Sequence, residues 1–111
     1  MCGIFALLNN NDTLDDKRIK DFFNKAKHRG PENSKILKIS DNLLYGFHRL
    51  AINGLNEVSN QPLVFKDCIL ICNGEIYNYK TLYSYMDSVP TTNSDCEVII
   101  HMYKKYKQII N

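Results

Sequence analysis

The stretch that governs the fold is residues 3–8, Gly-Ile-Phe-Ala-Leu-Leu, which is almost wholly apolar. A run of this length without polar alternation predicts a β-strand that is covered on both faces. A second apolar run, Cys68–Cys72, predicts another strand of the same kind. Strands that need cover on two faces, in a chain that also carries amphipathic helices, indicate a layered α/β (α+β) architecture.

Helical periodicity follows the first strand. Thr13 with Asp16 three residues later resembles a capping box and predicts that a helix begins there. The apolar residues that recur at helical spacing and are predicted to form its buried stripe are Ile19, Phe22, Phe23 and Ala26. The dipeptide Gly30-Pro31 predicts the end of this segment, because proline cannot continue a helix.

Strand pairs and two more helices are predicted in the remainder of the chain. The strand pairs are Ser34–Ile39 with Leu43–Phe47, and Leu63–Phe65 with Cys68–Cys72. A helix follows Asn73-Gly74, and Ser94 with Glu97 forms a second capping box that opens the last helix. The stripes predicted to be buried are Leu82, Tyr85, Met86 and Val89, and then Val98, Ile99, Met102, Tyr103 and Tyr106.

Composition and charge exclude several classes of protein. The 111 residues predict one domain, with 44% hydrophobic residues and a net charge of +2 from intermixed signs. No basic cluster indicates a nucleic-acid or anionic-membrane partner. No apolar run approaches the roughly 20 residues of a membrane helix, and no secretory signal is recognisable, so we expect a cytoplasmic protein.

The four cysteines do not form a disulfide or zinc pattern. Cys68 and Cys72 would lie about 13 Å apart on one face of a strand, too far to be bridged. No paired Cys-x-x-Cys or His-x-x-x-His spacing occurs, so no metal site is expected. Cys68, Cys72 and Cys96 are predicted to be small buried residues, whereas Cys2 calls for a separate interpretation.

Cys2 can act as a nucleophile because of its position. Initiator Met1 is normally removed before a small residue, which would expose an α-amino group on the same residue as the thiol. The reference pKa of that amine is about 8, so it is partly neutral at physiological pH and can accept a proton. An N-terminal nucleophile therefore carries its own general base. The alternative is an ordinary buried cysteine near a terminus.

Asn73-Gly74-Glu75 follows the apolar run Cys68–Cys72 directly. A side-chain amide and a backbone N–H at this position can point at one spot and form an oxyanion hole. The alternative is a type I′ hairpin turn, for which Asn-Gly is a strong signal. However, residues 76–82 are more typical of a helix than of a returning strand.

Two charged residues and one short motif are further candidates. Arg49, at the end of a predicted strand, can hold a carboxylate through two parallel hydrogen bonds, or can form an exposed ion pair. Asp95 lies just after the predicted cap Ser94, where it can stabilise the helix dipole or face a ligand ammonium. His28-Arg29-Gly30-Pro31 is equally typical of a helix C-terminus.

Taken together, these motifs resemble the class II (N-terminal nucleophile, or Ntn) glutamine amidotransferases, and among them the asparagine synthetases. The motifs that carry the resemblance occur in family order: Cys2-Gly3-Ile4-Phe5, His28-Arg29-Gly30-Pro31, His48-Arg49-Leu50-Ala51-Ile52, Gln61-Pro62-Leu63, Asn73-Gly74-Glu75-Ile76-Tyr77-Asn78 and Ser94-Asp95-Cys96-Glu97-Val98-Ile99. They extend over nearly the whole chain. The implied fold is the N-terminal part of a four-layer α/β/β/α Ntn-hydrolase sandwich.

The resemblance implies a role for each matched residue. Cys2 would attack the side-chain amide of glutamine, and Asn73 with Gly74 would stabilise the oxyanion. Ammonia leaves, and water releases glutamate, in support of asparagine biosynthesis. The residues implied in glutamine binding are Arg49, Leu50, Ala51, Ile52 and Asn53 for the α-carboxylate, and Asp95 and Glu75 for the α-ammonium. Residues 28–30 would shape the wall behind the nucleophile.

Residues 2–111 resemble only part of the family's glutaminase domain. The ATP- and Mg-dependent synthetase domain has no counterpart in the sequence, so no cofactor is expected in this chain. One hypothesis is therefore a glutaminase that a separate synthetase polypeptide, or the missing C-terminal part of the domain, completes. A second is a truncated, inactive relative that acts only as a glutamine-binding or interaction module. A third is a plain structural protein.

Overall fold

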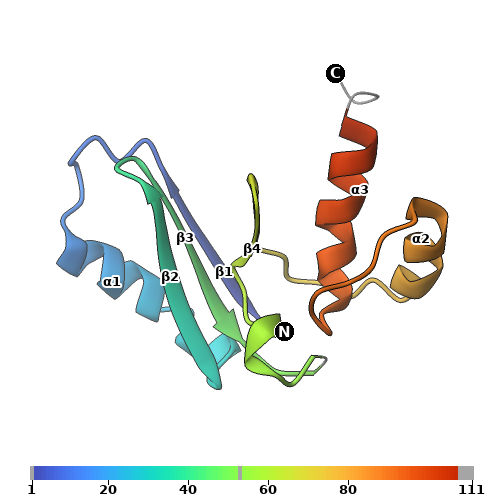
Figure 1. The fold of residues 1–111 in the computed structure, drawn as a ribbon. Coiled ribbons are helices and arrows are strands. Elements are labelled where there is room, and N and C mark those ends of the chain that lie inside the picture. Colours follow the sequence, from blue (N-terminus) through green and yellow to red (C-terminus); the bar gives the residue numbers. More distant parts are fainter. Residues whose placement is uncertain (1, 53, 108–111) are drawn as a thin grey trace.

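The structure, a computed structural model, describes residues 2–52 and 54–107. It is a mixed helix-and-strand (α+β) fold in which every strand pair is antiparallel (Figure 1). Its elements are β1 (Gly3–Leu8), α1 (Asp16–Asn24), η1 (Lys27–Arg29), β2 (Asn33–Ser40), β3 (Leu43–Arg49), η2 (Glu57–Ser59), β4 (Leu63–Phe65), β5 (Cys68–Leu70), α2 (Tyr79–Met86), η3 (Asp95–Glu97) and α3 (Val98–Tyr106), where η denotes a single 3₁₀ turn. All the predicted strands and helices are present.

The strands form two sheets. β1, β3 and β2 make a three-stranded sheet in the order β1-β3-β2, and β4 pairs with β5 in a hairpin. In the larger sheet Gly3 faces His48, so the residue before β1 meets the chain as it leaves β3. The register therefore brings Cys2 to the segment that begins with Arg49 and Leu50.

Helix α1 covers one face of the three-stranded sheet. Its N-cap is Asp15, whose carboxylate accepts a hydrogen bond from the Arg18 N–H at 2.8 Å, so the predicted Thr13–Asp16 capping box is wrong. Phe23 is buried and stacks on the His48 ring at a centroid distance of 3.9 Å. A side chain on Gly46 would lie 2.6 Å from the Phe23 ring, so only glycine permits this close packing.

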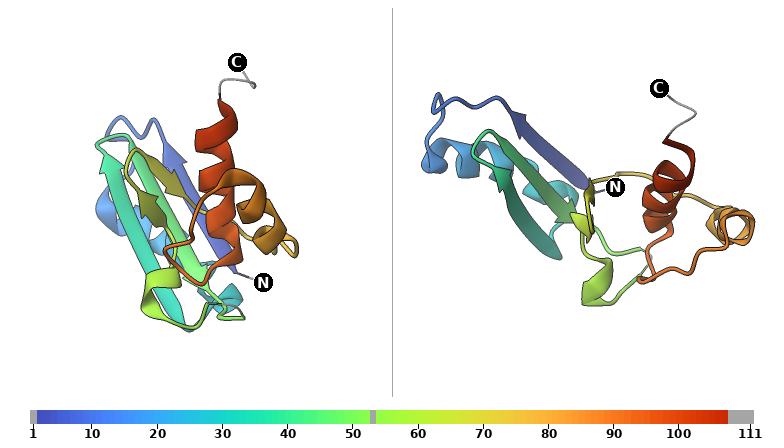
Figure 2. Two further views of the ribbon diagram at one scale, coloured as in Figure 1. Left: turned by 45° about the vertical axis from the view of Figure 1, so that its right-hand side comes forward. Right: turned by 45° about the horizontal axis from the view of Figure 1, so that its top comes forward.

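The other face of β1 is largely uncovered among the described residues, which contradicts the expectation of cover on both sides. Ile4 is 52% exposed and Leu8 is 61% exposed. Figure 1 and both views of Figure 2 show α1 on one side of the sheet, and the β4–β5 hairpin with α3 on the other. The hairpin and α3 lie on the same side as the exposed side chains of β1 but leave them largely open to solvent. The molecule is elongated, at 44 × 33 × 18 Å.

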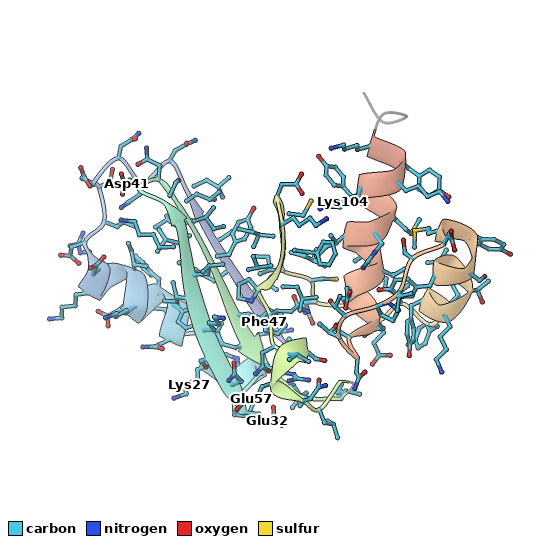
Figure 3. The ribbon with its side chains drawn as sticks, viewed as in Figure 1. Lys27, Glu32, Asp41, Phe47, Glu57 and Lys104 are labelled. Atoms are coloured by element: carbon cyan, nitrogen blue, oxygen red, sulfur yellow. The ribbon has the colours of Figure 1, made fainter. Side chains whose placement is uncertain are left out.

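The second half of the chain packs around α2 and α3, with a core of Tyr83, Met86 and Val98. Three residues predicted to be buried are more than half exposed, namely Tyr85, Val89 and Tyr103, and Phe22 of α1 is 46% exposed. α3 reaches the hairpin through Lys104, whose ammonium lies 2.6 Å from the Asp67 carboxylate (Figure 3). None of the helices in residues 2–52 and 54–107 is long and apolar enough to cross a membrane.

Glu97 does not form the predicted capping box with Ser94. Its carboxylate, 2% exposed, instead accepts hydrogen bonds from the backbone N–H groups of Thr91 and Thr92, at 2.8 and 2.7 Å. His101 Nε2 lies 3.0 Å from the same carboxylate. Glu97 therefore fastens the loop before η3 to the first turn of α3.

Glu97 should make the stability of the fold sensitive to acid. Burial alone would raise the pKa of Glu97, but hydrogen bonds from Thr92, Thr91 and His101 lower it to about 2. Because this pKa lies below the ordinary glutamate value of 4.5, the ionised carboxylate stabilises the fold above about pH 4.5, and the contribution disappears as the pH falls toward 2.

We therefore expect Glu97→Gln to lower the Tm at neutral pH by about 4–8 °C, the effect of roughly 1 kcal/mol in a domain of this size. The difference from wild type should narrow steadily on acidification below about pH 4.5. Thermal unfolding of both proteins, followed by circular dichroism from neutral pH to about pH 2, measures this difference in Tm. A difference that stays constant with pH would contradict the role assigned to the carboxylate.

Candidate active site

Cys2 lies where β1 begins, beside the end of β3. The backbone N–H of Leu50 donates a hydrogen bond to Cys2 Sγ at 3.3 Å, and the thiol in turn lies 3.5 Å from the Leu50 carbonyl oxygen. The antiparallel register explains this contact, because Gly3 faces His48 in the neighbouring strand. The Leu50 backbone thus contacts the Cys2 sulfur through both its N–H and its carbonyl oxygen.

Asn73 contacts the same residue from the second half of the chain. The Cys2 nitrogen donates to Asn73 Oδ1 at 3.1 Å, across 71 positions of sequence. In the chain with Met1 this nitrogen is a peptide N–H, and removal of Met1 would make it the α-amine. Because Oδ1 faces Cys2, the donating NH₂ end of the amide is the end that remains for a ligand.

The alternative of a hairpin turn at Asn73-Gly74 is wrong. The segment leads from β5 into α2 instead of into a returning strand. Asn73, Gly74 and Glu75 are all exposed at this connection. Side-chain and backbone N–H donors on an open connection can be directed at a bound ligand, as an oxyanion hole requires.

Of residues 28–30, Arg29 contacts Cys2. The Arg29 guanidinium donates through Nε to the Cys2 carbonyl oxygen at 3.3 Å. Gly30 packs against the backbone of β3, where an added Cβ would lie 2.2 Å from the His48 carbonyl oxygen, so glycine is required there. His28 is exposed and interacts with the Lys25 carbonyl oxygen through Nδ1, away from Cys2.

Arg49 is 6% exposed and organises the loop that follows β3. Its guanidinium donates to the carbonyl oxygens of Gly54 and Asn56 and to Asn60 Oδ1. The loop that it holds follows directly on residues 50–52. In that stretch the Ala51 N–H donates to Glu32 Oε2 at 3.2 Å, and the predicted ligand-binding residue Asn53 lies outside the described residues.

Asp95 and Glu75 lie at the connection between β5 and α2. Asp95 is 8% exposed, and its Oδ2 accepts a hydrogen bond from the Ile76 N–H at 2.5 Å. Asp95 therefore holds the connection that carries Asn73. The exposed Glu75 carboxylate accepts a hydrogen bond from Tyr77, which raises the pKa of Tyr77.

These residues surround one cavity of about 400 Å³. Of the predicted site residues, those that line it are Cys2, Arg49, Leu50, Ile52, Asn73, Gly74, Glu75 and Asp95, whereas Ala51 does not. The lining residues that sequence reasoning missed are Phe47, Ser59, Gln61, Cys72, Tyr77, Ser94 and Cys96.

Gln61 was visible in the sequence as part of the Gln-Pro-Leu motif, but the motif carried no assigned chemistry. Cys96 is buried, and burial together with the neighbouring Cys72 thiol raises the pKa of Cys96, so it is held as a neutral thiol.

Among residues 2–52 and 54–107, no group of three or more His, Cys, Asp or Glu side chains is arranged to hold a metal ion.

The profile of a family described as "glutamine amidotransferase domain" matches residues 1–110. The chain belongs to this glutamine amidotransferase family. It is also similar to asparagine synthetases described as glutamine-hydrolysing. The probable asparagine synthetase of Dictyostelium discoideum is 41% identical, and the match covers 94% of this chain and 20% of the relative. Asparagine synthetase 1 of Arabidopsis thaliana is 38% identical, and the match covers 96% of this chain and 19% of the relative.

A third relative, from Mesocricetus auratus, is 36% identical over 95% of the chain and 19% of the relative. This glutamine amidotransferase domain is therefore homologous to the glutaminase part of the asparagine synthetases, as its motifs predicted. The chain spans about a fifth of the length of these curated relatives.

Proposed function

We propose that this domain hydrolyses glutamine to glutamate and ammonia through Cys2, after removal of Met1. One observation carries the proposal. The Cys2 thiol, the Leu50 N–H that supports it and the Asn73 amide converge on one cavity from segments far apart in sequence. Its volume of about 400 Å³ is within the range of small-molecule sites and suits an amino acid.

The chemistry follows the family pattern. The Cys2 sulfur forms a bond to the side-chain amide carbon of glutamine, while the α-amine accepts the thiol proton. Asn73 and the Gly74 N–H stabilise the oxyanion that forms. The amine returns the proton to the leaving nitrogen, so that ammonia departs and a γ-glutamyl thioester remains. Water then attacks the thioester and releases glutamate and the thiol.

Substrate binding is assigned to the two walls of the cavity. Arg49 and the backbone of residues 50–53 would hold the α-carboxylate, and Asp95 with Glu75 would address the α-ammonium. This assignment is supported by the presence of both kinds of charge in one cavity, because Arg49, Asp95 and Glu75 all line it. A guanidinium that also holds the loop is well suited to carboxylate binding, because its geometry is set before the ligand arrives.

The partner of the domain is proposed to be a synthetase unit, in the same or a separate polypeptide, that uses the ammonia for asparagine formation with ATP and Mg. The finer fold proposal is the N-terminal part of a four-layer α/β/β/α sandwich. It is supported by the succession of α1, the three-stranded sheet, the hairpin and the α2–α3 pair in Figure 1. The proposed compartment is the cytoplasm.

The alternative of an inactive binding module is not favoured, because the residues proposed for chemistry, Cys2, Asn73 and Gly74, all line the cavity. The test is glutamate release from glutamine by the purified protein, with intact-mass analysis of its N-terminus. We expect activity only in protein that begins at Cys2. Equal activity in protein that retains Met1 would exclude the α-amine as the base, and no glutamate release from protein beginning at Cys2 would contradict the proposed function.

A further inference from the structure

The connection that carries Asn73 and Gly74 is held by side chains rather than by a β-ladder. β5 ends at Leu70, which faces Leu63 of β4, and the predicted extension of this strand to Cys72 is wrong. Beyond this pair the register would bring Pro62 opposite Ile71. Proline has no N–H to donate, so the backbone ladder stops there.

The Gln61 side chain takes the place of the missing ladder pair. Its Oε1 accepts a hydrogen bond from the Cys72 N–H at 2.6 Å, and its Nε2 donates to the Cys72 carbonyl oxygen at 3.1 Å. If the register of Leu63 and Leu70 continued for two more positions, it would bring Gln61 opposite Cys72. A primary amide offers one donor and one acceptor, as a strand residue does.

Gln61 is 6% exposed and lines the cavity next to Cys72. The other end of the connection is fixed by Asp95, which accepts the Ile76 N–H, and by the Cys96 thiol, which lies 3.4 Å from the Gly74 carbonyl oxygen. Side chains therefore hold the connection on both sides of Asn73 and Gly74. Gln61 holds Cys72, the residue immediately before Asn73.

We propose that Gln61 is a positioning residue that sets the place of the Asn73–Gly74 oxyanion donors relative to Cys2. The inference rests on the proposed glutaminase function and assigns a role to the Gln-Pro-Leu motif. Gln61 acts through the Cys72 backbone. Because hydrogen-bond donors must lie within a few tenths of an ångström of their best position, release of Cys72 should cost rate rather than glutamine binding.

The chain offers a matched control. Asn10 is buried and forms the same pair of hydrogen bonds with the backbone of Leu14. Its Oδ1 accepts a hydrogen bond from the Leu14 N–H at 3.0 Å, and its Nδ2 donates to the Leu14 carbonyl oxygen at 2.9 Å. Asn10 lies beyond the end of β1 that is opposite to Cys2. Asn10→Ala therefore removes the same kind of contact at a place remote from the cavity.

The first measurement is kinetic, on protein that begins at Cys2. Gln61→Ala and Gln61→Glu should each lower kcat for glutamine hydrolysis by about 10- to 100-fold with little change in KM. Alanine removes both hydrogen bonds to Cys72, and glutamate keeps the acceptor but loses the donor. Asn10→Ala should leave kcat within about twofold. In an Asn73→Ala background, Gln61→Ala should cost less than it does in the wild-type background, because one of the two donors that Gln61 positions is already gone.

The second measurement is amide hydrogen exchange of residues 72–76, which does not depend on activity. Gln61→Ala should speed exchange there, and Asn10→Ala should not. Unchanged exchange and kcat in Gln61→Ala, or a full additive cost in the Asn73→Ala background, would overturn the inference. If the wild-type chain released no glutamate, the proposed function would fail, and the exchange measurement would still decide whether Gln61 positions the connection.

Discussion

Cys2→Ala should abolish formation of the γ-glutamyl thioester and with it all glutamine hydrolysis. Loss of a covalent nucleophile costs on the order of a million-fold in kcat in a well-measured hydrolase, more than any other single change expected here. The cause is chemical, because no other group in the cavity combines a thiol with an adjacent amine. Incubation with labelled glutamine, followed by acid quench and mass analysis, detects the thioester on the wild-type chain.

Cys68→Ala is the matched control for this variant. Cys68 is a partly buried cysteine on β5 that is not among the residues lining the cavity, so its replacement should leave glutamate release within about twofold. A thioester that persists in Cys2→Ala, or that maps to Cys72, would contradict the assignment of the nucleophile. Both variants should unfold near the wild-type temperature.

Asn73→Ala should lower kcat by about 100- to 1,000-fold while KM changes little, which is the usual effect of removing one oxyanion donor. Asn73→Asp should be at least as damaging. Its carboxylate can accept the hydrogen bond from the Cys2 nitrogen, as Asn73 Oδ1 does at 3.1 Å, but it places a negative charge where the oxyanion must form. Steady-state kinetics with glutamine separate kcat from KM.

Asn78→Ala controls for loss of an asparagine in the same motif. Asn78 is exposed at the N-cap of α2, makes no side-chain capping bond and is not among the residues lining the cavity. Its replacement should leave kcat within about twofold. An Asn73→Ala variant that altered KM alone would show that Asn73 binds the ground state of glutamine rather than the oxyanion.

Local chemistry explains which parts of the fold were predictable. The apolar run 3–8 and the strand pair Ser34–Ile39 with Leu43–Phe47 are predicted from nearest neighbours alone, and the structure has these strands. Helix caps were less predictable. Asp15 caps α1 in place of Thr13, and Glu97 binds the loop before it instead of Ser94, because several polar side chains near each helix start compete for the same N–H groups.

Burial was predicted less well than secondary structure. Tyr83 rather than Tyr85 packs in the core of α2, although both lie on apolar parts of the sequence. A periodic pattern identifies a stripe only to within about one residue in each turn. Which edge of the stripe is buried depends on where α3 lies, and the position of α3 is a tertiary property.

The sequence by itself determined the family, the order of the elements and the identity of the candidate site residues, because these follow from residue types at fixed spacings. Only the tertiary structure decided how those residues meet. It alone showed that Gln61 clasps Cys72, that Arg49 holds its own loop and that Asn73 reaches Cys2. The physical reason is that each is a contact between segments with their own local structure. Register and packing, rather than spacing along the chain, bring such segments together.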